Sequence, residues 1–142
     1  MKIGPLKKVT AEALSDINRL MGQLRGKGAT LGTRAELREI VENKDSVMVV
    51  AEDGKKVVGV ATLYVFQKMG KRTGHIEDVV VDGEYRGQGI GKKLVLALIA
   101  AGKKNKLAVI HLTSRPEREA ANALYKKLGF KLKKTNPYSF HF

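Results

Sequence analysis

The sequence predicts a mixed α/β (or α+β) domain in which strands and helices alternate along 142 residues. Runs rich in β-branched residues are separated by turn residues, and two early stretches have apolar residues at helical spacing. A glycine-rich loop then leads from a strand into a helix. The length suits one domain with its own hydrophobic core, so we expect residues 1–142 to form a single domain.

The elements expected before the glycine-rich loop are two helices and four strands. Thr10 is a suitable N-cap for the first helix, and Thr33 and Glu36 form a capping box for the second. Asp53-Gly54 predicts a hairpin turn, and residues 68–73 predict a basic turn. In chain order we expect a strand from Ile3 to Val9, a helix from Thr10 to Gln23, a helix from Thr33, and strands Val47 to Glu52, Val57 to Gln67 and Gly74 to Val81.

The elements expected after the loop are two helices, one strand and a closing hairpin. Pro116 suits the first turn of the second of these helices, and Gly129 suits its end. A hairpin is expected around Asn136-Pro137. In chain order we expect a helix from Gly89 to Gly102, a strand from Leu107 to Thr113, a helix from Pro116 to Gly129, and strands Phe130 to Lys133 and Tyr138 to Phe142.

The composition argues against several classes of protein. Cysteine is absent, so neither a disulfide nor a thiolate nucleophile is available. With only three scattered histidines we expect no metal site. No apolar run is long enough to span a bilayer, and the first residues do not resemble a secretory signal. These features are typical of a cytoplasmic enzyme without membrane association.

The formal charge of +13 comes from lysines and arginines spread along the whole chain. A basic surface of this kind binds nucleic acid in some proteins, steers an anionic cofactor or substrate in others, and is simply solvated in others. Few aromatic residues lie among the lysines and no nucleic-acid motif appears. We therefore expect no nucleic-acid partner.

The most informative stretch is residues 76–91, which reads as a strand, a turn and a glycine loop (residues 86–91) that opens a helix. Unpaired N–H groups and the helix dipole favour a phosphate at a helix N-terminus, and glycine lets a ligand approach the backbone. The loop is not a P-loop, because Arg86 stands where the first glycine belongs and Lys93 where Ser or Thr belongs. Its glycine spacing also differs from the G-x-G-x-x-G of dinucleotide-binding folds.

The pattern Arg86-x-x-Gly89-x-Gly91, between a strand and a long helix, resembles the acetyl-CoA motif of the GNAT superfamily of N-acetyltransferases. Residues 119–130 (EAANALYKKLGF) resemble the second signature of that family, A-x-x-L-Y-x-x-x-G-F. The resemblance covers about Val47 to Phe142, and it implies a largely antiparallel sheet with helices on both faces. The strand from Gly74 to Val81 also resembles the corresponding strand of glucosamine-6-phosphate N-acetyltransferases.

The resemblance implies acetyl-CoA as the co-substrate and suggests its contacts. The pantetheine arm would lie along the backbone of Val79, Val80 and Val81, with an N–H near Val79 or Val80 as the oxyanion donor. Asn122 and Tyr125 would contact the same end of the cofactor. The glycine loop would hold the pyrophosphate through its backbone and Arg86, although Arg86 also suits a solvent-facing position. The loop residues implied are Arg86, Gly87, Gln88, Gly89, Ile90, Gly91 and Lys92.

The resemblance also suggests a base and an acid. Removing a proton from an alkylammonium of pKa about 10.4 costs about 4–5 kcal/mol at pH 7, and a positioned base contributes about 10²–10⁴-fold. Glu77 is the candidate base, acting directly or through water, or else a strand carboxylate that pairs with a nearby cation. Tyr125 is the candidate acid for the departing thiolate, or else a tyrosine packed against the sheet.

The sequence leaves the amine acceptor open. Glu77, Asp78 and Arg115 are the candidate substrate-binding residues. Asp78 points away from the face of Glu77 in a regular strand, but a β-bulge would turn it towards substrate. Arg115 suits an acidic or phosphorylated acceptor or an exposed surface position. His75 shares the face of Glu77 and is either a proton relay or a structural histidine.

Three functional hypotheses follow. The first is an acetyl-CoA-dependent N-acetyltransferase acting on a primary amine of a small molecule, with a protein lysine or N-terminus as the alternative acceptor. The second is a CoA-binding module without turnover. The third, a nucleic-acid-associated protein, has the least support. By analogy with the family, we also expect a homodimer formed through the final hairpin.

Overall fold

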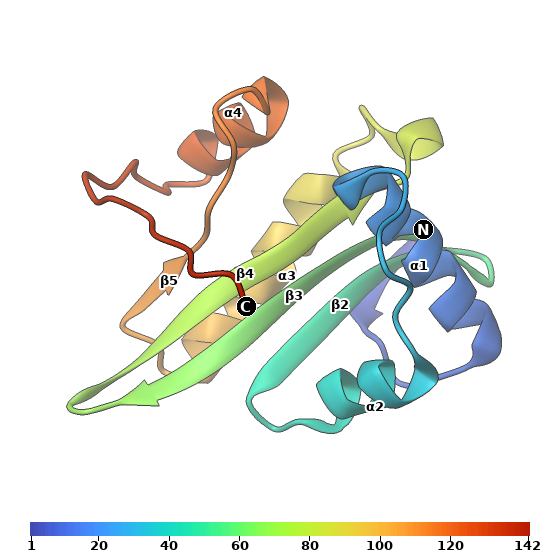
Figure 1. Cartoon of the computed structure of the whole chain (residues 1–142), viewed down its shortest axis with the longest axis horizontal. Helices are drawn as coiled ribbons and strands as arrows, with labels where there is room; N and C mark the ends of the chain where they lie inside the picture. The colour runs from blue at the N-terminus through green and yellow to red at the C-terminus, as the bar shows by residue number, and fades with distance from the viewer. The chain divides into compact units, whose positions relative to one another are not determined.

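The structure is a computed structural model that describes all 142 residues of the chain (Figure 1). The chain divides into two compact units, residues 1–112 and residues 113–142. The first unit contains every strand and the helices α1, α2 and α3, and the second contains α4. The expectation that residues 1–142 form a single domain stays a prediction.

The first unit is built around a five-stranded sheet in the order β1-β2-β3-β4-β5. All neighbouring strands are antiparallel except β4 and β5, which are parallel. The α/β class with a mixed, largely antiparallel sheet is thereby confirmed. The strands are β1 (Lys2–Pro5), β2 (Ser46–Asp53), β3 (Lys56–Lys68), β4 (Lys71–Val81) and β5 (Val109–His111).

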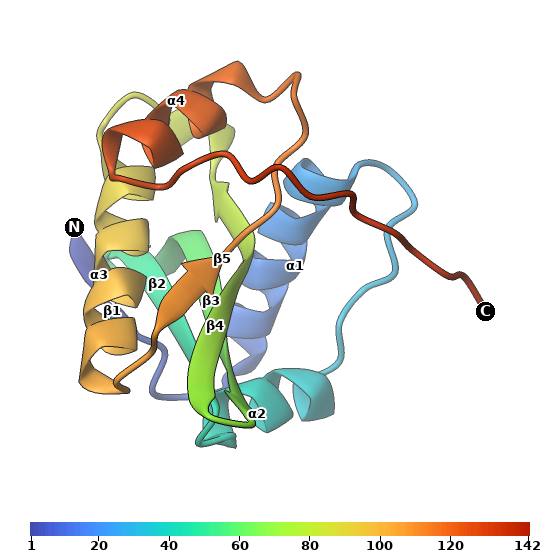
Figure 2. The same ribbon diagram turned by 90° about the vertical axis from the view of Figure 1, so that its left-hand side faces the viewer.

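Helices cover both faces of this sheet (Figure 2). The helices α1 (Ala11–Arg25) and α2 (Arg34–Glu42) lie on one face, and α3 (Ile90–Lys104) lies on the other. Thr10 caps α1 as predicted, and Thr33 with Glu36 forms the predicted capping box of α2. No helix of the structure combines the length and the apolar character needed to cross a membrane.

The two faces are packed by different residues. Ile17 and Leu20 of α1 join a core with Val60 and Val80 of the sheet. On the other face, α3 approaches β3 closely because residue 59 is glycine. A Cβ at Gly59 would lie 3.1 Å from Leu94 Cδ1 and 3.3 Å from Ile90 Cγ2. Ile90 is the first residue of α3, so this packing anchors the helix start that follows the glycine loop.

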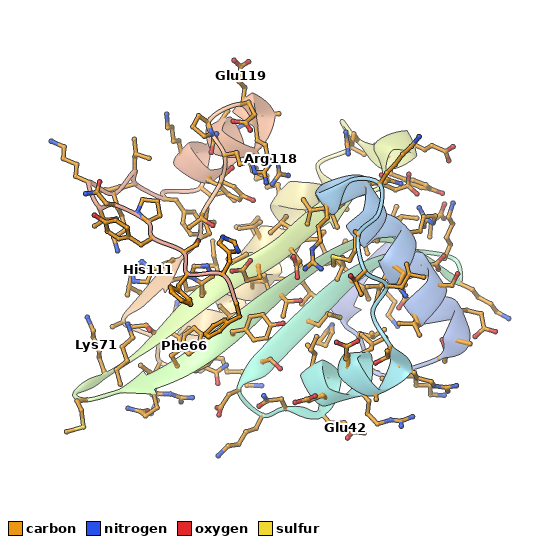
Figure 3. The ribbon with its side chains drawn as sticks, viewed as in Figure 1. Glu42, Phe66, Lys71, His111, Arg118 and Glu119 are labelled. Carbon is orange, nitrogen blue, oxygen red and sulfur yellow. The ribbon has the colours of Figure 1, made fainter.

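The second unit contains α4 (Glu119–Lys127), which begins after Arg118 (Figure 3). The rings of Tyr125 and Phe130 meet edge to face, with centroids 5.9 Å apart. The predicted hairpin of Phe130 to Lys133 and Tyr138 to Phe142 is wrong, because residues 128–142 form no strand. The side chains of residues 131–142 are exposed, so no apolar burial offsets the entropy lost in ordering two strands, and Pro137 lacks the N–H of a ladder bond.

Several predicted boundaries also change. The predicted basic turn over residues 68–73 is wrong, since β3 and β4 pair as far as Lys68 and Lys71 and only two residues form the turn. Gly70 has a φ of 82°, which allows such a short turn. Beyond β2 the two strands form a ribbon that carries Phe66 and Lys71 (Figure 3). The strands β1 and β5 are shorter than predicted, and α4 begins three residues after Pro116.

Candidate functional site

The glycine loop has the geometry of an anion-binding backbone. It follows a short 3₁₀ turn (Gly83–Tyr85), and α3 starts at Ile90 with Gly89 as its N-cap. Gly87 and Gly89 have φ values of 79° and 74°, which favour glycine, and a Cβ at either position would meet nothing within 4 Å. No side chain caps the helix start, so its first N–H groups stay available to a ligand.

The side chains of the loop make few contacts within the protein. Arg86, Gln88 and Lys92 are exposed, and Arg86 Nε makes one long hydrogen bond of 3.4 Å to the carbonyl of Val81. Ile90 is buried in the core, so the predicted cofactor contact of this residue would have to come from its backbone. The structure thus brings the predicted loop residues together and offers an anion their main-chain N–H groups.

The edge of β4 is open where the pantetheine arm was predicted to lie. The strand β5 pairs only with residues 73–75 of β4, so Val79, Val80 and Val81 lie beyond the last β5 pair. The Val80 side chain is buried against α1, which leaves its backbone as the part that faces this edge. A chain-like ligand can therefore add to β4 at this point as an extra strand does.

A β-bulge interrupts β4 beside this open edge. Val80 pairs with Val60 and Glu77 pairs with Thr62, so the two residues between them oppose a single residue of β3. Asp78 has a φ of 56°, an uncommon conformation for a residue other than glycine. The bulge that the sequence analysis considered is therefore present, and it redirects the Asp78 side chain.

Glu77 and His75 form a close pair on the face of the sheet that α1 and α2 cover. Glu77 pairs in register with Thr62, and His75 with Tyr64. Glu77 Oε1 lies 3.0 Å from His75 Nε2, and the Glu77 side chain is 49% exposed. The carboxylate therefore has an imidazole neighbour on one side and is accessible to solvent on the other.

Asp78 is held by α1. Its Oδ1 accepts a hydrogen bond of 2.9 Å from Nη2 of Arg25 in the last turn of that helix. Burial and then the charges of Asp78 and Glu77 raise the pKa of Tyr64, whereas Arg25 lowers it. We call these residues the carboxylate site: Arg25, Tyr64, His75, Glu77 and Asp78.

A buried aspartate fixes the turn that leads into the glycine loop. Asp82 is 4% exposed and accepts hydrogen bonds from the backbone N–H of Glu84 and from Arg19 of α1. The Glu84 N–H, and after it Arg19, hold the pKa of Asp82 below its usual value. The next residue, Gly83, donates a backbone N–H hydrogen bond of 3.0 Å to the side-chain oxygen of Gln23 in α1. The entry of the loop is thus tied to the same helix that supplies Arg25.

The remaining predicted site residues lie in the second unit. Burial raises the pKa of Tyr125, whose side chain is 6% exposed, while Arg118 opposes the shift. A phenol of raised pKa stays protonated at neutral pH, as a general acid requires. Asn122 Nδ2 donates a hydrogen bond of 2.9 Å to the carbonyl of Arg115, and the Arg115 side chain is exposed. Their joint action with Glu77 stays a prediction.

Sequence reasoning missed three participants in this region. Arg25 is separated from Asp78 by 53 positions, and Arg19 from Asp82 by 63. Nothing local in the sequence signals either pair. Tyr64 had a weak signal, because it alternates with Thr62 on the strand before Glu77 and so shares one face of β3.

Comparison with known proteins agrees with this geometry. The sequence model of the family described as acetyltransferase (GNAT) family matches residues 15–130. Glucosamine 6-phosphate N-acetyltransferase of Trypanosoma brucei brucei is 39% identical over 79 residues. That match covers 54% of this chain and 52% of the relative, so the chain spans about half the length of this curated relative.

Two further proteins extend the likeness over more of the chain. L-2,4-diaminobutyric acid acetyltransferase of Shouchella clausii is 30% identical over 127 residues, which are 88% of this chain and 70% of that protein. The crystal structure of glucosamine-6-phosphate N-acetyltransferase from Arabidopsis thaliana has a TM-score of 0.78 and 27% identity. That likeness covers 98% of this chain and 97% of the other.

Proposed function

The chain belongs to the acetyltransferase (GNAT) family, and from this premise we propose that it transfers the acetyl group of acetyl-CoA to a primary amine of a small molecule. The observation that carries the proposal is the continuous path along β4. The carboxylates Glu77 and Asp78, the bulge, the open strand edge and the glycine loop follow one another within residues 75–91. An amine, a thioester and a pyrophosphate would need these features in this order.

The residues present fit acetyl-CoA. The open edge of β4 presents backbone groups to an extended pantetheine arm, and the glycine loop presents N–H groups to the pyrophosphate. When bound, the cofactor supplies an activated acetyl thioester whose sulfur leaves as a thiolate. The N–H of Val79 or Val80 would stabilise the oxyanion that forms on the acetyl carbonyl.

Glu77 would take the proton of the acceptor ammonium, directly or through a water molecule. Its half-exposed carboxylate lies at the bulge, next to the open edge, where an amine can reach it. Tyr125 would donate a proton or a hydrogen bond to the departing thiolate. The raised pKa of this phenol favours that role, because the group stays protonated as the pH rises.

We propose that the acceptor carries an anionic group besides its amine. The names of two relatives specify such acceptors, glucosamine 6-phosphate and 2,4-diaminobutyric acid. Arg25 belongs to the carboxylate site and has a half-exposed side chain, and Arg115 is an exposed arginine of the second unit. A guanidinium binds a carboxylate or a phosphate through two parallel hydrogen bonds.

An acceptor panel tests this function. Purified protein with acetyl-CoA is incubated with glucosamine 6-phosphate, glucosamine, 2,4-diaminobutyrate, a polyamine and a lysine peptide, and thiol release is measured with the mass of the product. We expect turnover on an anionic small amine. Turnover on the lysine peptide alone would replace the small-molecule acceptor by a protein. Cofactor binding without turnover on any amine would support a CoA-binding module instead.

The location and the oligomeric state also stay proposals. We propose a cytoplasmic protein that works as a homodimer. The final hairpin that was expected to form the interface is not formed in this structure. Sedimentation at several protein concentrations measures the oligomeric state directly, and a monomer at all concentrations would end the dimer proposal.

A further inference from the structure

His75 forms a direct contact with the proposed base. Its Nε2 lies 3.0 Å from Glu77 Oε1, and the two residues are two positions apart on β4 with their side chains on the same face. The His75 side chain is 29% exposed, so water reaches the ring. No other ion pair or hydrogen bond of the structure engages the Glu77 carboxylate.

The groups around His75 come from all the elements packed beside it. Tyr64 is its register partner on β3, and His111 is its register partner on β5. Asp78 and Arg25, from β4 and α1, neutralise one another at 2.9 Å. Glu77 is therefore the one carboxylate near His75 that has no cationic partner of its own, which makes it the natural partner of an imidazolium.

We propose that His75 is a positioning and proton-relay residue that removes the transferred proton from Glu77 in each catalytic cycle. The inference rests on the proposed acetyl transfer. The ammonium of the acceptor gives one proton to the Glu77 carboxylate. Its freed electron pair then forms the bond to the acetyl carbon as the carbon–sulfur bond breaks, and the sulfur leaves as the thiol with a second proton from the nitrogen. Glu77 then passes the first proton to Nε2 of the neutral ring, which carries its own proton on Nδ1. The resulting imidazolium releases one proton to water, and both groups return to their starting charge.

The chemical reason is the difference in ordinary pKa between an ammonium donor and a carboxylic acid. An alkylammonium has an ordinary pKa of about 10.4, a glutamic acid about 4.3 and an imidazolium about 6.5. The ordinary pKa of an imidazole is thus about 2 pH units above that of a carboxylate, so it binds a proton roughly a hundredfold more tightly. The carboxylate contributes the contact with the acceptor, and the imidazole contributes the affinity for its proton.

The test compares His75→Gln with His111→Gln in full-length protein that turns over an amine. Glutamine at position 75 keeps a polar amide beside Glu77, but it cannot accept and release a proton at neutral pH. We expect kcat to fall about tenfold or more, the lower end for a group that assists general base catalysis. The KM for acetyl-CoA should stay unchanged, and added imidazole should restore part of the rate. The His111→Gln control should keep the wild-type rate and gain nothing from imidazole.

The pH dependence separates a relay from a structural role. The wild-type rate should fall on the acid side as the ring becomes protonated, and His75→Gln should lose this limb. Two results would overturn the relay alone. One is a His75→Gln rate equal to that of wild type at every pH. The other is a lower rate that imidazole does not restore and that still falls on the acid side as the wild-type rate does. Absence of turnover in wild-type protein would overturn the proposed function and the relay with it.

Discussion

The glycine loop and the β4 residues of the carboxylate site are close in the sequence, yet the two regions are built in different ways. The loop offers backbone N–H groups, and its geometry depends on two glycines with positive φ. The carboxylate site depends on side chains from α1, β3 and β4, which a bulge with an uncommon backbone conformation holds together. The difference suggests that a universal co-substrate is bound by backbone and a particular acceptor by side chains.

This contrast predicts opposite sensitivities to substitution. The loop should tolerate changes of its exposed side chains but not a change in its glycines. The carboxylate site should lose rate or selectivity when one side chain changes, while cofactor affinity stays the same. Variants of Gly89, Glu77 and Arg25 test this separation, and variants of Tyr125 and Asp82 test two residues outside both regions.

Gly89→Asp should have the largest effect and abolish acetyl-CoA binding. The residue has a φ of 74°, and a carboxylate there would repel the pyrophosphate. Repulsion of several kcal/mol corresponds to a loss of about a hundredfold or more in affinity, measured by calorimetry. Gly70→Asp is the matched control, with a φ of 82° in the distant β3–β4 turn. Equal affinity in both variants would remove the pyrophosphate assignment.

Glu77→Gln should lower kcat by about 10²–10⁴-fold, the usual range for a general base. The Kd of acetyl-CoA should not change, because the loop and the open strand edge are untouched. Steady-state kinetics and calorimetry measure the two quantities. Glu42→Gln, at the exposed end of α2, is the control (Figure 3). A parallel loss of cofactor affinity in Glu77→Gln would contradict the separation of the two regions.

Tyr125→Phe should lower kcat by about tenfold to a hundredfold, as expected for a lost hydrogen bond to a developing charge. Burial raises the pKa of this phenol, so the wild-type acid stays protonated above the ordinary value of 10.0. The wild-type rate should therefore show no alkaline loss from this group up to about pH 10. A pH–rate profile checks this, and an undiminished rate in the variant would leave Tyr125 with a packing role.

Asp82→Asn should lower the free energy of unfolding by about 1.5 kcal/mol at neutral pH, through lost hydrogen bonds to a charged group. The folded pKa lies below the ordinary 3.8, so the stabilisation is present above that value and is lost as the pH falls through the lower folded value. Urea unfolding of both proteins between pH 7 and 2 measures the difference. A difference that does not shrink at low pH would contradict the ionised role of Asp82.

Arg25→Ala should have the smallest effect. The pair with Asp78 is partly exposed, and exposed pairs contribute about 0.2–1 kcal/mol. We expect the KM for glucosamine 6-phosphate to rise by up to about fivefold, which corresponds to 1 kcal/mol, and the KM for glucosamine to stay unchanged. Arg38→Ala removes a similarly exposed arginine of α2 and is the control. The same rise for both acceptors would contradict recognition of an anion by Arg25.

The same contrast explains what the sequence revealed. The glycine loop could be predicted because its residues are contiguous and glycine positions determine its backbone locally. The order of elements followed from β-branched runs and helix caps in the same way. The carboxylate site could be predicted only where its residues are close in sequence, as with Glu77 and Asp78.

The parts that sequence reasoning missed depend on tertiary packing. The Arg25–Asp78 pair forms because α1 ends over the bulge of β4, and no local pattern sets that distance. The error at the C-terminus has the opposite origin. Tyr138, Phe140 and Phe142 alternate as in a strand, but all three are exposed, so the local pattern has no packing partner in the chain.

The most direct test of the central claim is a calorimetric titration of acetyl-CoA followed by thiol release with an anionic small amine. We predict saturable binding to wild-type protein, loss of binding in Gly89→Asp, and one thiol released for each amine acetylated. Absence of binding to wild-type protein would contradict the account at its base, because the glycine loop would then be no more than the entry to a helix.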